Sequence, residues 1–174
     1  MKSNHKRWTL MLMVILLVVI GVALSLAPLA SAVDQTKLIG TWKLVSFDAE
    51  LQETGELNPI LGKNPKGYLI FTPEGRAMTV FTAGDRKAPK TDEERAAAFT
   101  SMYAYSGLYR IEGDKMTWKL DVSWNEAWTV NELVRSLKLE GDRLKIISAW
   151  MPSTNPRFHL GKMVRAIITW ERVK

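Results

Sequence analysis

The clearest alternation of polar and apolar positions lies between Lys115 and Val122. Met116, Trp118, Leu120 and Val122 take every second position, and polar or charged residues stand between them. A β-strand with one face turned toward a core shows this period of two. We therefore expect these four side chains to point into the interior of the domain.

Similar segments recur along the chain, and short turns containing Gly with Asp or Glu separate six of them into pairs. Glycine takes the positive φ that a tight hairpin turn requires, so these pairs predict three β-hairpins. Eight short strands joined largely in this way predict an all-β fold, either an up-and-down antiparallel barrel or a sandwich. The expected strands are 41–47, 67–72, 76–82, 107–111, 115–122, 133–139, 144–150 and 163–172.

One helix interrupts the strands. Thr91 is a good N-cap residue, and Glu94 stands three positions later, which is the spacing of a capping box. Phe99, Met102 and Tyr103 would share one face of such a helix. We expect the helix to pack across the barrel or to cover one of its mouths.

The alternation places one charged residue among inward positions. Leu133, Leu137 and Leu139 share a face of their expected strand, and Arg135 lies on the same face. An unpaired arginine is costly to bury. Arg135 is therefore interpreted in one of three ways: as an anchor for the carboxylate of a ligand, as half of an internal ion pair, or as an outward residue in a shifted register.

Aromatic residues recur at positions expected to face inward. They either line a ligand pocket or simply fill the core; these residues are Tyr68, Tyr105, Tyr109, Trp118 and Trp150. Trp124 and Trp128 stand apart from them in the irregular segment 123–131. At a barrel mouth these two could gate a ligand, touch a membrane surface or fold back on the barrel.

The N-terminal segment has the layout of a secretory signal peptide. Basic residues come first, an uncharged apolar run covers 8–26, and Ala30-Ser31-Ala32 provides a small-x-small cleavage site. We expect cleavage after Ala32 and a secreted or periplasmic domain over 33–174. The alternative is an uncleaved anchor, because the apolar run is close to the ~20 residues that span a bilayer. Contact with a membrane is expected only through this segment, if it is retained.

The charge of the chain is modest. Its formal net charge is +6, and the signal segment removes three basic residues and no acid, which leaves about +3. No run of basic residues alternates with aromatic ones to form a stacking groove. The sequence therefore predicts no nucleic-acid partner.

Residues typical of catalytic and metal sites are largely missing. The chain contains no cysteine, so it offers no disulfide and no thiolate. His159 is the one histidine beyond the signal segment, which leaves zinc without a ligand set and haem with a single candidate in an expected loop. Neither Gly-x-Ser-x-Gly nor a Gly-rich phosphate loop occurs. We expect no metal, no cofactor and no recognisable catalytic residue.

Two motifs at the ends of the domain resemble the lipocalin pattern. Gly40-Thr41-Trp42 begins the first expected strand, and Trp170-Glu171-Arg172 ends the last. In lipocalins the arginine lies over the tryptophan and closes the bottom of the barrel, so the resemblance implies this role for Gly40, Trp42 and Arg172. An ordered set of further motifs is similar to the bacterial and fungal lipocalin-like domain proteins and covers nearly all of 33–174. These motifs are Pro65 to Phe71, Pro73-Glu74-Gly75-Arg76, Tyr103 to Gly107, Val134-Arg135 and Gly141 to Leu144.

The resemblance implies an eight-stranded antiparallel barrel with an internal pocket, and it leaves three functions open. The first is an exported protein that binds a small apolar or amphipathic molecule, with Arg135 holding a carboxylate. The second is an isomerase or cyclase for a hydrophobic metabolite, although the family usually carries a histidine near Trp118-Lys119, where this chain has none. The third is a structural envelope protein whose barrel is filled by its own side chains.

Overall fold

The computed structural model describes residues 33–154 and 160–174. The predicted signal segment and His159 lie outside the described residues. Residues 32–174 make up one compact unit.

The described chain is built almost entirely of strands. The elements are η1 (Gln35–Lys37), β1 (Gly40–Leu51), β2 (Leu57–Pro59), β3 (Lys66–Phe71), β4 (Arg76–Thr82), α2 (Asp92–Thr100), β5 (Met102–Glu112), β6 (Lys115–Ser123), η2 (Glu126–Trp128), β7 (Leu133–Glu140), β8 (Arg143–Ile147), β9 (Met151–Pro152) and β10 (Met163–Arg172).

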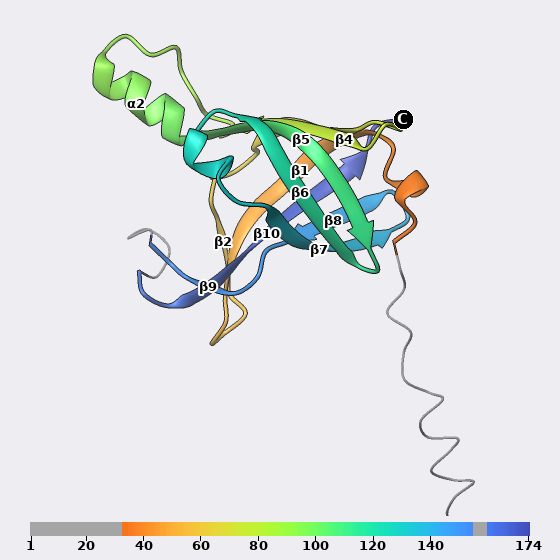
Figure 1. Ribbon diagram of the computed structural model, residues 1–174. Coiled ribbons are helices and arrows are strands. Elements are labelled where there is room, and N and C mark those ends of the chain that lie inside the picture. Colours follow the sequence, from red (N-terminus) through yellow and green to blue (C-terminus); the bar gives the residue numbers. More distant parts are fainter. Residues whose placement is uncertain (1–32, 155–159) are drawn as a thin grey trace, which may run out of the picture. The chain divides into compact units, whose positions relative to one another are not determined.

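Eight of these strands close an antiparallel barrel (Figure 1). The hydrogen-bonded order runs β1-β3-β4-β5-β6-β7-β8-β10, and β10 returns to pair with β1. The two short strands β2 and β9 pair with the ends of β1 and β10 that lie farthest from Gly40 and Arg172. The predicted eight-stranded antiparallel barrel is confirmed, and the three predicted hairpins appear as β3–β4, β5–β6 and β7–β8.

The predicted helix forms, but it is shorter than expected and contributes nothing to the core. The Thr91 hydroxyl accepts a hydrogen bond from the Glu94 backbone at 3.2 Å, and the Glu94 carboxylate accepts one from the Thr91 backbone. Met102 and Tyr103 belong to β5, because α2 ends at Thr100. None of the residues of α2 is buried, so the expectation that this helix packs across the barrel is wrong.

A β-bulge changes the facing of residues near the end of β6. Ser106 pairs with Val122, whereas Gly107 pairs with Leu120, so Asp121 is an extra residue in β6. Val122 is turned outward as a result and is 62% exposed, which corrects its predicted inward position. The close crossing of β5 and β6 requires glycine at 107, because a β-carbon there would lie 2.0 Å from the Lys119 carbonyl oxygen.

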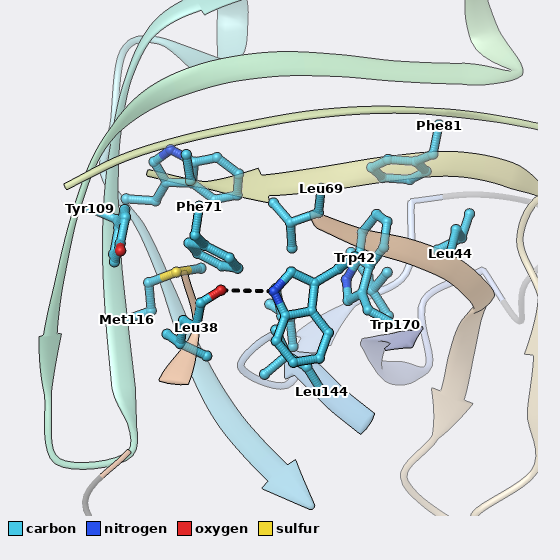
Figure 2. Close-up of a cluster of buried hydrophobic side chains, with 14 of the residues drawn as sticks. Leu38, Trp42, Leu44, Leu69, Phe71, Phe81, Tyr109, Met116, Leu144 and Trp170 are labelled. Atoms are coloured by element: carbon cyan, nitrogen blue, oxygen red, sulfur yellow. Dashed lines mark hydrogen bonds between the residues drawn. The ribbon is translucent and has the colours of Figure 1, made fainter. Parts of the chain in front are cut away.

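The closed end of the barrel is organised around Trp42. Its indole N–H donates to the Leu38 carbonyl at 2.8 Å (Figure 2). The guanidinium of Arg172 lies over the ring, with Cζ 4.2 Å from the ring centroid. Gly40 has a φ of 123°, and a β-carbon on it would be 3.3 Å from Nη1 of Arg172. The motifs at the two ends of the domain therefore meet at one point.

Large apolar side chains fill the barrel above this closure. The largest that are almost wholly inaccessible to solvent come from β1, β3, β4, β6, β8, β10 and the residue after η1 (Figure 2); they are Trp42, Trp170, Phe71, Phe81, Leu38, Leu69, Met116 and Leu144. The interior is thus a packed core, and any site inside it is bounded by these side chains.

Candidate ligand site in the barrel interior

One small cavity remains between the inward side chains. Tyr105, Trp118, Arg135 and Trp170 line it together with aliphatic residues. The space open to the centres of water molecules is about 10 Å³, which is room for about one water. The cavity accommodates a small polar group but no hydrocarbon body.

Arg135 points into the barrel from β7. Its side chain lines the cavity, so the outward register considered for it is wrong. The internal ion pair is not found either, because no carboxylate among residues 33–154 and 160–174 lies within ion-pair distance of its guanidinium. The side chain donates one hydrogen bond, at 2.8 Å, to the carbonyl of Val134. Burial lowers the pKa of Arg135, whereas its electrostatic interaction with Tyr105 opposes that shift.

Two of the tryptophans that line this cavity carry indole N–H groups without an acceptor. The Nε1 atoms of Trp118 and Trp170 are buried and lack a hydrogen-bond partner among the described residues. Buried donors in native proteins are nearly always paired, so two unpaired ones beside a single cavity are unusual. An indole N–H can only donate, and the same is true of a guanidinium. These groups therefore match a ligand atom that accepts hydrogen bonds.

The fourth polar group of the cavity is the Tyr105 hydroxyl. Burial raises the pKa of Tyr105 to about 12, although the charge of Arg135 acts in the opposite direction. The hydroxyl is therefore protonated at neutral pH and is able to donate. Thr79 also lines the cavity, but its hydroxyl already donates to the Tyr68 carbonyl at 2.9 Å. The cavity thus concentrates donors and lacks a carboxylate.

Aromatic rings fill the space between the cavity and the mouth of the barrel. We call Tyr103, Trp124 and Trp128 the aromatic cap. The Trp128 ring centroid lies 5.7 Å from that of Tyr105, and the Trp124 centroid lies 4.9 Å from those of both Tyr103 and Trp128. Both tryptophans pack against the core cluster, so of the three positions considered for them they adopt the one folded back on the barrel.

The structure brings three of the predicted pocket residues together around the cavity: Tyr105, Trp118 and Arg135. Tyr109 is also buried, but it lies outside the cavity. Its ring contacts Phe71 at a centroid distance of 5.0 Å, next to the β3–β4 turn. Tyr109 is therefore part of the packing toward the closed end of the barrel.

Tyr68 and Trp150 do not face the interior, which corrects their predicted placement. Tyr68 is 50% exposed, because the inward positions of β3 belong to its neighbours Leu69 and Phe71. Trp150 follows the end of β8, where strand alternation no longer applies. The guanidinium carbon of Arg165 lies 4.5 Å from its ring centroid.

Several residues of the cavity were not expected as ligand contacts, and Trp170 is the aromatic one among them; the others are Leu69, Thr79, Leu133, Ile146 and Ile168. The sequence does predict an inward position for Trp170, because this residue alternates with Ile168 on the inward face of the last strand. What the pattern does not show is that its indole N–H lacks an acceptor, since that depends on side chains from other strands.

Within residues 33–154 and 160–174, no group of three or more His, Cys, Asp or Glu side chains is placed to bind a metal ion. Among those residues, no helix has the length and apolar character needed to cross a membrane.

Comparison with known proteins identifies the family. No curated protein matches the chain. The family model described as lipocalin-like domain matches residues 39–173, which contain the whole barrel from β1 to β10. With most of its length matched in this way, the chain belongs to the lipocalin-like domain family.

Proposed function

We propose that this barrel binds a small amphipathic molecule whose carboxylate is held by Arg135 and the indole N–H groups of Trp118 and Trp170. A lipocalin-like barrel is a scaffold suited to ligand binding in general. The observation that carries the proposal is that, within the part of the chain that the structure describes, one small interior cavity is lined by an arginine without an acidic partner and by two tryptophans whose buried indole N–H groups are unpaired. Leaving such donors unpaired costs free energy in the empty protein, and an acceptor that binds among them recovers that cost.

The apolar part of such a ligand needs space that the aromatic cap now occupies. Trp128 belongs to the three-residue helix η2, and its backbone N–H donates to the Asn125 carbonyl at 3.0 Å. A three-residue helix has little regular structure of its own to break, so the cost of moving it lies mainly in the ring contacts with Tyr103 and Tyr105. In the bound state the hydrocarbon body replaces the rings of Trp124 and Trp128, and the carboxylate reaches Arg135 beneath them.

A second candidate function follows from the size of the cavity. With about 10 Å³ of free space, the barrel could be a filled structural module in which one trapped water accepts hydrogen bonds from the donors. This candidate predicts no ligand and no role for the charge of Arg135 in binding.

Titration with a matched pair of probes separates the two candidates. We expect decanoate to bind and to change the tryptophan fluorescence, whereas decanol, which lacks the carboxylate, binds more weakly. Arg135→Met should weaken decanoate binding by about 10- to 100-fold, the range expected for a hydrogen bond to a charged group. Lys138→Met is the control, because Lys138 lies on the same strand and its side chain is 61% exposed.

Two outcomes would contradict carboxylate binding. In one, decanoate binds equally well to the wild-type protein and to Arg135→Met. In the other, neither probe binds, and the protein purified from its host shows only its own mass in native mass spectrometry. The second outcome would favour the filled barrel.

We further propose that the barrel acts outside the cytoplasm. The support is the order of basic residues, apolar run and small-x-small site in residues 1–32. Expression in a bacterial host, followed by fractionation and N-terminal sequencing, tests this proposal. A periplasmic or secreted chain beginning at Val33 is expected, whereas a cytoplasmic chain that retains Met1 would contradict it.

A further inference from the structure

A second site lies on the outer face of the barrel, where four neighbouring strands present apolar side chains to solvent. Tyr68, Met78, Val80 and Val122 are between 48% and 62% exposed. Outward positions of an antiparallel strand that faces water are normally polar. A cluster of apolar residues there is typical of a surface that contacts another molecule.

The strand register makes these residues contiguous. Tyr68 pairs with Val80, Val80 pairs with Ala104, and the Trp124 backbone N–H donates to the Ala104 carbonyl at 2.7 Å. One apolar row therefore crosses β3, β4, β5 and the residue that follows β6.

A second row lies beside the first. Ile70 pairs with Met78, Met78 pairs with Ser106, and Ser106 pairs with Val122. The bulge at Asp121 is what brings Val122 to this face. The two rows together form a surface that we call the outer groove.

The outer groove is hollowed as well as apolar. Its free volume is about 410 Å³, within the range of sites that hold small molecules or lipid chains. Ala104 and Ser106 have short side chains, whereas Tyr68 and Val122 are taller on either side of them. This space is much larger than the cavity inside the barrel.

Three lysines lie on strands that form or border the outer groove. Lys43 is the β1 partner of Tyr68, and Lys66 precedes Tyr68 by two positions on the same face of β3. Lys119 extends from β6 beside Leu108. None of these three lysines forms an ion pair with a described residue.

The two acidic residues near these lysines do not neutralise them. Asp121 accepts two hydrogen bonds from the Arg76 guanidinium, at 2.9 Å and 2.7 Å, so its charge is already compensated. Glu171 is the β10 partner of Lys43 and lies on the side of that lysine away from Tyr68. The rim of the outer groove therefore carries excess positive charge.

We propose that the outer groove docks on an anionic lipid surface. The apolar rows enter the acyl region, and Lys43, Lys66 and Lys119 contact the headgroup phosphates. Aromatic rings suit the lipid–water interface, and Tyr68, which is 50% exposed, supplies one there; Trp124 lines the groove, but its ring packs back on the core. A second copy of this chain fits less well, because a symmetric contact would bring the same unpaired lysines against each other.

This inference goes beyond the proposed function and does not depend on a ligand inside the barrel. It also differs from membrane attachment through the N-terminal segment. The test therefore uses the chain from Val33 onward, since residues 32–174 form one compact unit with a closed barrel.

Vesicle co-sedimentation tests the docking. We expect binding to vesicles of phosphatidylcholine mixed with phosphatidylglycerol, weaker binding to phosphatidylcholine alone, and loss of binding at high salt. Val80→Glu and Met78→Glu should each weaken binding by about tenfold or more. Replacing Lys66 or Lys119 by Gln should weaken it about fivefold each.

Matched controls use residues outside the outer groove. Val134→Glu changes an apolar residue of β7 that is 51% exposed, and Lys138→Gln removes a charge from the same strand. Both should bind as the wild-type protein does. Circular dichroism checks that every variant retains the barrel, and the two independent glutamate variants keep the test valid if one of them misfolds.

Three results would overturn the proposal. The first is the absence of binding to the mixed vesicles, and the second is an equal loss of binding in Val134→Glu and Val80→Glu. The third is a dimer of the wild-type chain that Val80→Glu dissociates, which would assign the outer groove to a second copy.

Discussion

The guanidinium of Arg172 covers the indole of Trp42 at 4.2 Å from the ring centroid and also donates hydrogen bonds to two backbone carbonyls. The acceptors are the carbonyl oxygens of Ile39, at 3.0 Å, and Lys37. One side chain at the end of β10 thus holds η1 and the residue before β1 against the last strand. Closure of the barrel at this end depends on the same group that shields the tryptophan from solvent.

Arg172→Ala should therefore destabilise the barrel strongly. The variant loses the stacking on Trp42 and leaves two carbonyls without their donor, so we expect the free energy of unfolding to fall by about 2–4 kcal/mol. Arg172→Lys should recover only part of this loss, because an ammonium group cannot stack and donate to both carbonyls in the same geometry. Urea unfolding measures both changes.

Arg143→Ala provides the control, since Arg143 is an exposed residue of β8 near the same end of the barrel. Its replacement should change stability by less than about 0.5 kcal/mol. Equal losses for Arg172 and Arg143 would show that the contact with Trp42 contributes little to closure.

The features that the sequence could predict are those carried by local patterns. The alternation from Met116 to Leu120 and the Gly-containing turns depend on residues close in sequence, and they identify the strands and hairpins correctly. The inward position of Arg135 follows in the same way from the leucines around it. The expected contact between Trp42 and Arg172 came from the family resemblance, because nothing local links two residues so far apart.

The features that could not be predicted depend on other strands. The facing of Val122 is set by a bulge relative to β5, and that of Trp150 by where β8 ends. Tyr68 belongs to a strand with two apolar faces, Tyr68 with Ile70 and Leu69 with Phe71, so alternation alone does not decide which face points inward. The small size of the cavity results from the combined volume of side chains from most of the strands, which no local pattern contains.

Alkaline pH should destabilise the protein through Tyr105. Burial raises the pKa of Tyr105 to about 12 in the folded protein, against 10.0 for an unperturbed tyrosine. Below pH ~10 the hydroxyl is protonated in both the folded and the unfolded state, and its contribution to the free energy of unfolding is complete. Between pH ~10 and ~12 only the unfolded chain loses the proton, so the free energy of unfolding falls by up to about 1.4 kcal/mol per pH unit.

Urea unfolding of the wild-type protein and Tyr105→Phe across this pH range isolates the effect. The difference between the two proteins removes the titration of the lysines, which is common to both. We expect the wild-type protein to lose more stability than Tyr105→Phe as the pH rises. Parallel curves for the wild-type protein and Tyr105→Phe would contradict the raised pKa.

Gly107→Ala should disrupt the crossing of β5 and β6. The added β-carbon would lie 2.0 Å from the Lys119 carbonyl oxygen and 2.7 Å from the α-carbon of Leu120. Backbone atoms cannot move away as a flexible side chain does, so we expect a loss of about 3 kcal/mol or more. Thermal unfolding or the yield of soluble protein measures this effect.

Gly113→Ala is the matched control in the turn of the same hairpin. A β-carbon on Gly113 meets nothing within 4 Å, so only its positive φ of 64° is strained. The expected loss is about 1–2 kcal/mol. If Gly107→Ala is no more harmful than Gly113→Ala, the strands can separate at the bulge without penalty.

Arg135→Met should make the protein more stable while it weakens carboxylate binding. Methionine matches arginine along its aliphatic stem and has no charge to desolvate, and the guanidinium has no acidic partner among the described residues to lose. We expect the free energy of unfolding to rise by about 1–3 kcal/mol without ligand. Lys138→Met, on the outer face of β7, should change it by less than about 0.5 kcal/mol. If Arg135 serves binding at the expense of stability, its replacement should raise the free energy of unfolding and lower the affinity for decanoate. A loss of stability in Arg135→Met would instead mean that the guanidinium stabilises the empty barrel, and the case for a ligand anchor would then rest on the two indoles alone.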